Sequence, residues 1–246
     1  MELKICHMYP DVLNLYGDRG NIRCITRRLQ WRDIGAEVTR LPIGSSAPLS
    51  RFDLVFIGGG QDFEQQVLLE DLHRGKDREI RAAIEDGVTF LTICGGYQML
   101  GSYYETYDGQ RCDFIGALDL YTVGGKKRMI GNYSFRCGEE SGGSVVVGFE
   151  NHSGQTFLGS GVKPLGRVLI GCGNNGQDGS EGARYKNVYG TYSHGPLLPK
   201  NPVFCDQVLL TALTRKYGSA ELAPLDDSAE LAAHDEMLRR LEKEGP

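Results

Sequence analysis

Two short apolar runs that each end in glycine constrain the fold of this chain more than any other feature. Phe52 to Ile57 (FDLVFI) is followed by Gly58-Gly59-Gly60, and Val88 to Ile93 (VTFLTI) is followed by Cys94-Gly95-Gly96. Continuous apolar runs of this length are typical of strands buried on both faces of a parallel sheet. Glycine directly after a strand permits a sharp turn and a close backbone approach. The sequence therefore predicts a parallel sheet whose strands end in tight loops.

The first hundred residues alternate between strand and helix patterns. Strands are predicted from Leu3 to Met8 and from Ala36 to Leu41, and a helix between them carries Ile22, Ile25 and Leu29 on one face. A helical stretch from about Phe63 to Asp86 is interrupted at Gly75. This alternation predicts a doubly wound, mostly parallel α/β sheet flanked by helices, with ligand sites beyond the carboxyl ends of its strands.

The second half of the chain has a different texture. Between about Tyr103 and Tyr192, short β-like runs are separated by Gly, Asn and Asp, which predicts an antiparallel β extension of the same domain. Residues 203–217 predict a helix, and Asp227 with Glu230 predicts the cap of a C-terminal helix that reaches Glu244. We expect a single domain over residues 1–246, with a core of about 1–217 and a helical tail of about 226–244.

Composition excludes several classes of protein. The 246 residues are 40% hydrophobic and 24% charged, which is typical of a globular chain. With 27 basic and 32 acidic residues the net charge is −5, so a general electrostatic attraction to nucleic acid or anionic lipid is disfavoured. The seven cysteines contain no C-x-x-C pair, and we predict no metal site. No apolar leader or run of 18 apolar residues occurs, which favours a cytoplasmic protein.

Cys94 is the candidate nucleophile. It stands between the strand that ends at Ile93 and a short helical stretch, with Gly95 and Gly96 directly after it. A nucleophile on such a strand-to-helix turn is lifted out of the sheet, and small neighbours leave room for the turn. The positive end of the helix favours the thiolate, which is the nucleophilic form of the side chain. The alternative is that Cys94 is one more buried free cysteine.

A thiolate nucleophile needs a proton donor for its leaving group, and histidine is the natural candidate. His194 ends the run Tyr189 to Pro196 (YGTYSHGP), a strand stopped by a Gly-Pro turn, so its ring is expected at a sheet edge. His152 is the second candidate. His7, His73 and His234 are expected to be ordinary core or surface residues. A lone histidine at a strand end is more often structural, and it is the pairing with Cys94 that favours His194.

Several motifs together resemble a known family. They are Asn14 to Asn21 (NLYGDRGN), Gly58 to Gly60, Thr92 to Gln98 (TICGGYQ), Gly148 to His152 (GFENH), Gly173 to Asn175 (GNN) and Gly190 to Pro196 (GTYSHGP). In this order they resemble a class I glutamine amidotransferase domain of the cobyric-acid-synthase (CobB/CobQ) type. Within that type they are most similar to the glutaminase subunits that work with the Mur-ligase-like protein MurT.

The resemblance implies roles for particular residues. Cys94 would attack the carboxamide of glutamine, and His194 would protonate the departing ammonia and then activate water. The N–H groups of Gly95 and of Gly60 or its neighbour Gly59 would stabilise the oxyanion.

Arg128 would hold the α-carboxylate of the substrate, although it could equally belong to a solvated basic hairpin. Gln98 would line the amide pocket.

Two positions depart from the general amidotransferase pattern. Thr92 stands two residues before the cysteine where many relatives have glycine, and Pro196 stands two residues after the histidine where many have glutamate. Because proline cannot orient an imidazole, either the enzyme uses a Cys-His dyad or another carboxylate supplies this function. Asp18 is the candidate carboxylate, and the alternative is that it simply caps the helix that follows it.

The chain has no recognisable place to bind ATP. Neither a G-x-x-x-x-G-K-[ST] loop nor a G-x-G-x-x-G fingerprint occurs in it. No cofactor is therefore expected in this chain, and ATP and Mg²⁺ are expected only in a partner subunit. The resemblance implies that this partner is a MurT-like ligase, which amidates the D-glutamate of the lipid II stem peptide. The protein would then meet the inner face of the membrane only through the lipid-linked substrate of its partner.

Three other functions remain open at the level of the sequence. The chain could supply ammonia to a corrinoid or other amide-forming synthetase. It could instead be a non-catalytic module that binds a ligand or partner, in which case Cys94 would not react with a glutamine-like electrophile. A cysteine peptidase built on the same sheet is the third alternative. The C-terminal helix, with Leu231, Leu238 and Leu241 on one side, could pack on a partner or on its own domain.

Overall fold

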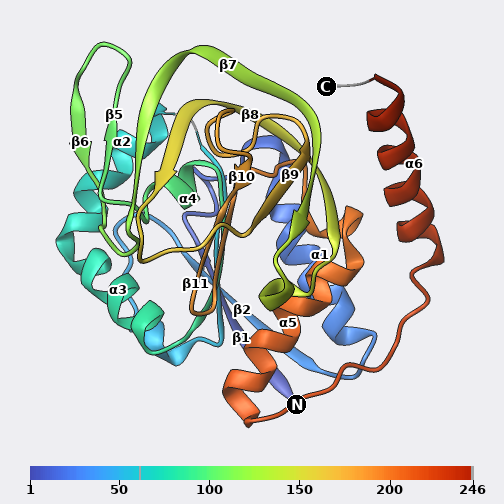
Figure 1. Ribbon diagram of the computed structural model, residues 1–246. Coiled ribbons are helices and arrows are strands. Elements are labelled where there is room, and N and C mark those ends of the chain that lie inside the picture. The colour runs from blue at the N-terminus through green and yellow to red at the C-terminus, as the bar shows by residue number, and fades with distance from the viewer. Residues whose placement is uncertain (61, 245–246) are drawn as a thin grey trace.

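The computed structural model describes residues 1–60 and 62–244, and its central element is a mostly parallel sheet (Figure 1). The strand order in this sheet is β11-β12-β4-β3-β1-β2. All neighbouring pairs are parallel except the pair β11 and β12. The strands are β1 (Glu2–Met8), β2 (Gly35–Leu41), β3 (Leu54–Ile57), β4 (Thr89–Ile93), β11 (Ala183–Tyr185) and β12 (Val188–Thr191).

The two apolar runs of the sequence form the inner strands of this sheet. Every residue of β3 and of β4 is buried, as the absence of polar alternation predicts. Strand β3 lies between β1 and β4, and β4 lies between β3 and β12. The predicted α/β class and the predicted parallel sheet are therefore confirmed.

Helices cover both faces of the sheet. Figure 1 shows α2 and α3 on one side of it and α1 and α5 on the other. A π turn over Leu72–Lys76, in which Gly75 has φ of 119°, separates α2 from α3, as the predicted interruption at Gly75 requires. The helices are α1 (Arg19–Gln30), α2 (Asp62–Asp71), α3 (Asp77–Glu85), α4 (Gly95–Gln98), α5 (Pro202–Tyr217) and α6 (Ser228–Glu244), with short 3₁₀ turns at Leu15–Gly17 (η1), Leu49–Arg51 (η2), Glu139–Ser141 (η4) and Leu198–Lys200 (η5).

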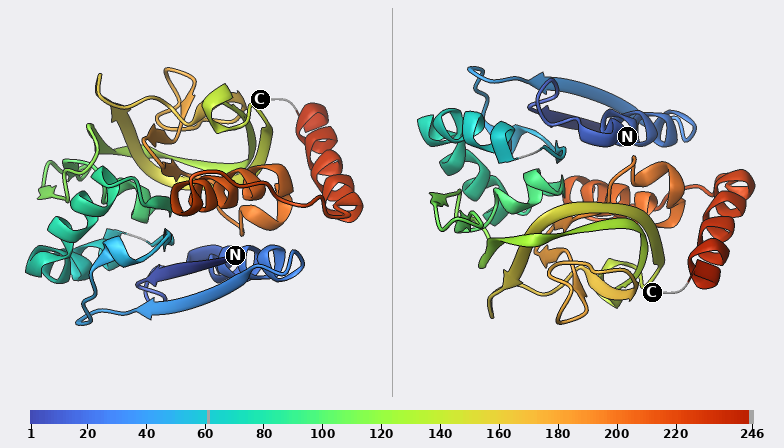
Figure 2. Two further views of the ribbon diagram at one scale, coloured as in Figure 1. Left: turned by 90° about the horizontal axis from the view of Figure 1, so that it is seen from below. Right: turned by 90° about the horizontal axis from the view of Figure 1, so that it is seen from above.

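A second sheet forms a layer of its own, on the opposite side of α5 from the N-terminal strands (Figure 2). Its longest pair is β7 with β8, which is antiparallel and shifts register between Gly124 and Met129. The basic segment around Arg128 thus lies inside one long strand, and the expectation of a basic hairpin there is wrong. The strands are β5 (Tyr103–Glu105), β6 (Arg111–Asp113), β7 (Leu120–Cys137), β8 (Val145–Leu158), β9 (Gly166–Ile170) and β10 (Ser180–Glu181).

The end of the predicted β extension belongs to the first sheet. Strand β12 pairs with β4 in parallel, with Thr191 opposite Ile93. The expectation of a single antiparallel extension up to Tyr192 is therefore wrong for this strand. The pairing matters for function because it places the segment after β12 beside the turn after β4.

The C-terminal helix α6 packs on its own chain. It contacts η5, β7 and β8, and Leu241 at its end is 3% exposed. Asp227, predicted as its cap, stands directly before the helix and binds Arg28 of α1, with 2.5 Å between Arg28 Nη1 and Asp227 Oδ1. Arg28 also bonds Asp206 of α5 at 2.7 Å, so one buried guanidinium joins α1 to α5 and to the start of α6.

In residues 1–60 and 62–244, no helix is both long enough and apolar enough to cross a membrane.

Candidate active site

Cys94 lies on a sharp turn at the carboxyl end of β4. Its backbone has φ of 47° and ψ of −107°, and the four-residue helix α4 follows at once. Its N–H donates to the carbonyl of Thr191 at 2.8 Å, which ties the turn to β12. Gly96 permits the turn, because a Cβ there would lie 2.6 Å from the carbonyl oxygen of Gly58. A strained backbone at this point is the geometry that presents a nucleophile at the edge of a sheet.

His194 lies in the segment that follows β12, beside this turn. Its N–H donates to the carbonyl of Phe149 at 2.9 Å, and its side chain is fully buried. Neither ring nitrogen has a hydrogen-bond partner among the described residues. Burial, with smaller effects from His152 and Lys200, lowers the pKa of His194 to about 3. The imidazole is therefore neutral near pH 7, which is the form that accepts a proton.

Asp18 lies next to His194 in the same buried space. Its Oδ2 atom is 4.0 Å from His194 Nδ1, and both side chains are fully buried. Asp18 occupies the N-cap position of α1 but makes no capping hydrogen bond with its side chain. Asn14 Oδ1 instead accepts the N–H of Arg19 at 2.9 Å, so the expectation that Asp18 simply caps the helix is wrong. Burial raises the pKa of Asp18 to about 7, against the opposing effect of a hydrogen bond from Gly59.

Pro196 explains how Asp18 comes so close to the histidine. A Cβ on Gly20, in the first turn of α1, would lie 2.5 Å from Pro196 Cγ. The turn after His194 therefore packs directly on the N-terminal end of α1. The proline two residues after the histidine thus packs on the helix end that directly follows Asp18.

The three predicted oxyanion glycines lie at the ends of β3 and β4. Gly59 donates its N–H to Asp18 Oδ2 at 2.6 Å, and a Cβ on Gly59 would lie 2.5 Å from His194 Cε1. In this conformation its N–H is thus engaged by Asp18. Gly60 is buried beside it. Gly95 opens α4, where the first N–H groups of a helix have no partner within the helix.

Arg128 and Gln98 occupy different depths of the site. Arg128 is exposed on β7, and its Nε–H donates to Asn151 Oδ1. Gln98 is buried on α4, and its Nε2 donates to the hydroxyl of Tyr192 at 3.0 Å. The Arg128 side chain is therefore accessible to solvent, whereas the Gln98 side chain lies in the interior, one helical turn after Cys94.

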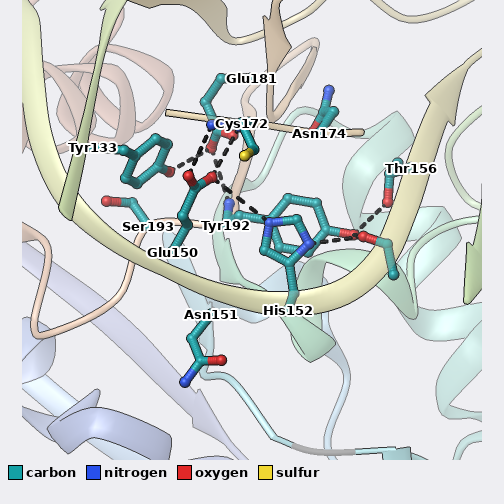
Figure 3. A network of polar contacts seen from close by, with 12 residues as sticks. Tyr133, Glu150, Asn151, His152, Thr156, Cys172, Asn174, Glu181, Tyr192 and Ser193 are labelled. Atoms are coloured by element: carbon teal, nitrogen blue, oxygen red, sulfur yellow. Dashed lines mark hydrogen bonds and ion pairs between the residues drawn. The ribbon is translucent and has the colours of Figure 1, made fainter. Parts of the chain in front are cut away.

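A buried polar network around Tyr192, directly after β12, includes the second candidate histidine, His152 (Figure 3). The ring of His152 stacks on Tyr192 at 3.5 Å between centroids, and its Nδ1 lies 2.7 Å from the carbonyl oxygen of Gly154. Glu181 accepts hydrogen bonds from the hydroxyl of Thr191 at 2.6 Å and from the N–H of Tyr192 at 2.9 Å. These contacts hold the segment that leads to His194, which gives His152 and Glu181 a supporting position.

Two residues that the sequence did not single out also reach the site. Tyr16 lies edge-on to the His194 ring at 4.9 Å between centroids, and the side chain of Asn151 donates to the Tyr16 hydroxyl. Both residues belong to motifs of the family resemblance. The sequence signal is the turn Leu15-Tyr16-Gly17-Asp18, in which an aromatic residue stands two positions before the buried carboxylate.

In residues 1–60 and 62–244, no group of three or more His, Cys, Asp or Glu side chains could hold a metal ion.

The sequence that forms this fold matches a family of known proteins. The model of the CobB/CobQ-like glutamine amidotransferase domain matches residues 4–202, and the chain belongs to this family. It is 40% identical to the lipid II isoglutaminyl synthase (glutamine-hydrolysing) subunit GatD of Staphylococcus aureus strain N315, over 99% of this chain and 98% of that protein. It is also 40% identical to the GatD subunit of Streptococcus pneumoniae strain R6, over 88% of this chain and 83% of that protein.

Solved structures agree on the fold. PurLQS from Thermotoga maritima superposes with a TM-score of 0.59 at 16% identity, covering 87% of this chain and 99% of the other. At that identity the likeness shows the α/β fold alone. The family match and the two relatives are what connect this fold to glutamine amidotransferase chemistry.

Proposed function

We propose that this chain is the glutaminase subunit of a lipid II isoglutaminyl synthase. It would hydrolyse L-glutamine to glutamate and ammonia, and an ATP-dependent, MurT-like ligase subunit would use the ammonia to amidate the D-glutamate of the lipid II stem peptide. The identity to GatD over almost the whole length of both proteins supports the choice of this enzyme. ATP and Mg²⁺ would bind to the partner, on the cytoplasmic side of the membrane.

One observation carries the proposed chemistry. His194 is fully buried with both ring nitrogens unpartnered among the described residues, and it lies in the segment after β12, the strand that pairs with the one ending at Cys94. Buried polar groups are normally hydrogen-bonded, so an unpartnered buried imidazole lowers the stability of the fold and calls for a functional explanation. Accepting the proton of the Cys94 thiol is such a purpose.

The reaction would proceed in two halves. The sulfur of Cys94 attacks the carboxamide carbon, His194 passes the thiol proton to the departing nitrogen, and ammonia leaves a glutamyl thioester. His194 then takes a proton from water, the hydroxide attacks the thioester, and glutamate departs as the thiol re-forms. Asp18 would stabilise the imidazolium that exists in each half.

The oxyanion of each tetrahedral intermediate would be held by backbone N–H groups. Gly95 and Gly60 are our preferred donors, because the N–H of Gly59 already bonds Asp18. Loss of one such donor costs about 3–4 kcal/mol of transition-state stabilisation in other enzymes.

A reconstitution experiment tests this function. The chain is co-expressed with the candidate ligase and supplied with amide-labelled ¹⁵N-glutamine, ATP, Mg²⁺ and lipid II, and label is sought in the stem peptide. Cys94→Ala should abolish glutamine-dependent amidation and leave ammonia-dependent amidation intact. Cys6→Ala, which changes a buried cysteine of β1, is the control. Undiminished glutamine-dependent amidation by Cys94→Ala would end the proposal.

Two alternatives give different results in the same preparation. A subunit of a corrinoid or other synthetase would hydrolyse glutamine and leave lipid II unlabelled. A non-catalytic binding module would neither release glutamate nor be labelled at Cys94 by a glutamine-like electrophile.

A further inference from the structure

Tyr16 has a backbone conformation that residues other than glycine rarely adopt. Its φ is 54° and its ψ is 25°, in the left-handed region. The loop is held in this shape from both ends, because Leu15 donates its N–H to the Gly59 carbonyl at 3.1 Å and Asn14 accepts the N–H of Arg19. Strained residues of this kind collect at functional sites, where the surroundings impose them.

The ring of Tyr16 lies against the histidine from the solvent side. The centroids of the Tyr16 and His194 rings are 4.9 Å apart at an interplanar angle of 62°. The ring of Phe149 also packs on the Tyr16 ring, with 5.5 Å between their centroids. Tyr16 is 41% exposed whereas His194 is fully buried. The strained backbone therefore holds an aromatic ring as a cover over the imidazole.

The hydroxyl of the same side chain belongs to a chain of hydrogen bonds that ends at Arg128. Asn151 donates from Nδ2 to the Tyr16 hydroxyl, and its Oδ1 accepts the Nε–H of Arg128. Since a guanidinium only donates, the amide oxygen must face Arg128 and the amide nitrogen must face Tyr16. Figure 3 shows Asn151 pointing away from its neighbour His152, as alternation along β8 requires.

The hydrogen bonds from Tyr16 through Asn151 leave the terminal nitrogens of Arg128 available to bind a ligand. Arg128 uses Nε for Asn151, and among the described residues its two terminal nitrogens have no hydrogen-bond partner. A guanidinium fixed at Nε presents its remaining donors in one plane, which suits a carboxylate.

We propose that Tyr16 is a positioning residue that couples the substrate clamp to the catalytic histidine, because its hydroxyl fixes Asn151 and Arg128 while its ring covers His194. This inference rests on the proposed function, in which Arg128 holds the α-carboxylate of glutamine. Removing the hydroxyl alone should loosen the clamp and leave the histidine covered.

Tyr16→Phe isolates the hydroxyl, since it keeps the ring and its contact with His194. We expect KM for glutamine to rise about five- to twentyfold with kcat within about twofold, as for the loss of one hydrogen bond that orients a charged group. Tyr121→Phe is the matched control, because Tyr121 is a half-exposed tyrosine of β7 that stacks between Tyr103 and Phe157. Unchanged KM in Tyr16→Phe would overturn the proposal.

A second substrate separates clamp loosening from general damage. L-Glutamine α-amide has the shape of glutamine without the α-carboxylate charge. The kcat/KM for glutamine divided by that for the α-amide therefore measures how strongly Arg128 favours the carboxylate. Tyr16→Phe should lower that ratio about fivefold or more. A fall in kcat/KM that is equal for both substrates indicates a merely structural role and contradicts the proposal.

Double-mutant cycles test whether the three residues act as one chain. Asn151→Leu should lower the ratio by itself, and adding Tyr16→Phe should lower it little further, because both changes break the same chain. Additive effects would overturn the proposal.

If Arg128→Lys leaves the ratio unchanged, the assigned role of Arg128 fails. If Arg128→Lys lowers the ratio and Tyr16→Phe does not, only the coupling through Tyr16 fails.

Discussion

Asp18 and His194 share a space that water does not reach, and burial favours the uncharged form of each side chain. The pKa of Asp18 is raised to about 7 and that of His194 is lowered to about 3. In the proposed mechanism the imidazole carries a positive charge during turnover, and a buried charge is tolerable only beside an anion. Asp18 is placed to supply the anion, at 4.0 Å from His194 Nδ1.

The first prediction concerns catalysis by Asp18→Asn. The amide retains an oxygen for the Gly59 N–H but provides no negative charge, so the imidazolium loses its counter-ion. We expect kcat for glutamine hydrolysis to fall about tenfold to hundredfold with KM changed by less than about threefold. Steady-state assays at pH 7.5 check this. An unchanged kcat would mean that Cys94 and His194 act as a dyad.

The second prediction concerns stability against pH in the same variant. The folded-state pKa of Asp18 is about 7, above the ordinary 3.8, so its stabilising contribution is present below 3.8 and is lost as pH rises through 7. The side-chain amide that replaces the carboxyl group in Asp18→Asn does not titrate. Between pH 5 and pH 8 the wild type should therefore lose about 2–3 kcal/mol of unfolding free energy relative to Asp18→Asn.

Urea denaturation at several pH values measures this difference. The contribution of His194 to stability changes with pH in the opposite direction, because its lowered pKa gives stability that is lost as pH falls below 6.5 towards 3. Its contribution is present in both proteins and largely cancels in the difference. Asp235→Asn, which changes an exposed carboxylate of α6, is the control, and the hypothesis fails if the two variants behave alike.

At the scale of helices and strands, local pattern predicted most of the parallel sheet. The strands that end at Met8, Leu41, Ile57 and Ile93 were all predicted. For the last two the reason is plain, because their continuous apolar runs are stable only inside a covered sheet. The predicted helix over 203–217 is confirmed as α5 (Pro202–Tyr217). The strand-to-helix turn at Cys94 could likewise be read from the two glycines after it.

Which strands pair with each other was harder to predict from the sequence. The segment around Arg128 was a candidate for a basic hairpin, yet it lies inside β7, where glycine and a register shift permit a strand to bend. Strand β12 joins β4 rather than the second sheet, because register and partner depend on contacts far along the chain. The proximity of Asp18 to His194 was a prediction of the same difficult kind, since it depends on how the turn at Pro196 packs against α1.

Gly20→Ala tests that packing. An added Cβ would lie 2.5 Å from Pro196 Cγ, so α1 and the turn after His194 must move apart. We expect a loss of about 1–3 kcal/mol of unfolding free energy together with a fall in kcat, because Asp18 moves with the helix. Gly138→Ala is the matched control, since a Cβ there meets nothing closer than 3.8 Å. Unaltered kcat in a destabilised Gly20→Ala would contradict the link to Asp18.

At the scale of the whole molecule, Arg28 joins three helices that lie far apart in sequence. It is 2% exposed and bonds both Asp206 and Asp227. Arg28→Ala would leave Asp227 without its cation, whereas Asp206 would keep its ion pair with Arg32, so we predict a loss of about 3 kcal/mol in unfolding free energy. Because α6 is tied to α1 through Asp227, limited proteolysis should also cut more readily between α5 and α6.

Arg27→Ala is the control for this change. Arg27 is the exposed neighbour of Arg28 on the same helix, and its bond to Gln30 is also exposed. Equal stability and equal cleavage of the two variants would show that the buried guanidinium does not hold α6 in place.

The position of β12 also has a consequence for synthesis on the ribosome. Strand β4 lies between β3 and β12, and its partner on one side is encoded about a hundred residues later. Until that late segment emerges, the nascent polypeptide presents an apolar strand with one unpaired edge, a surface prone to association with other chains. The same late segment carries His194, so the proposed proton acceptor of the Cys94 thiol is synthesised about a hundred residues after the thiol itself.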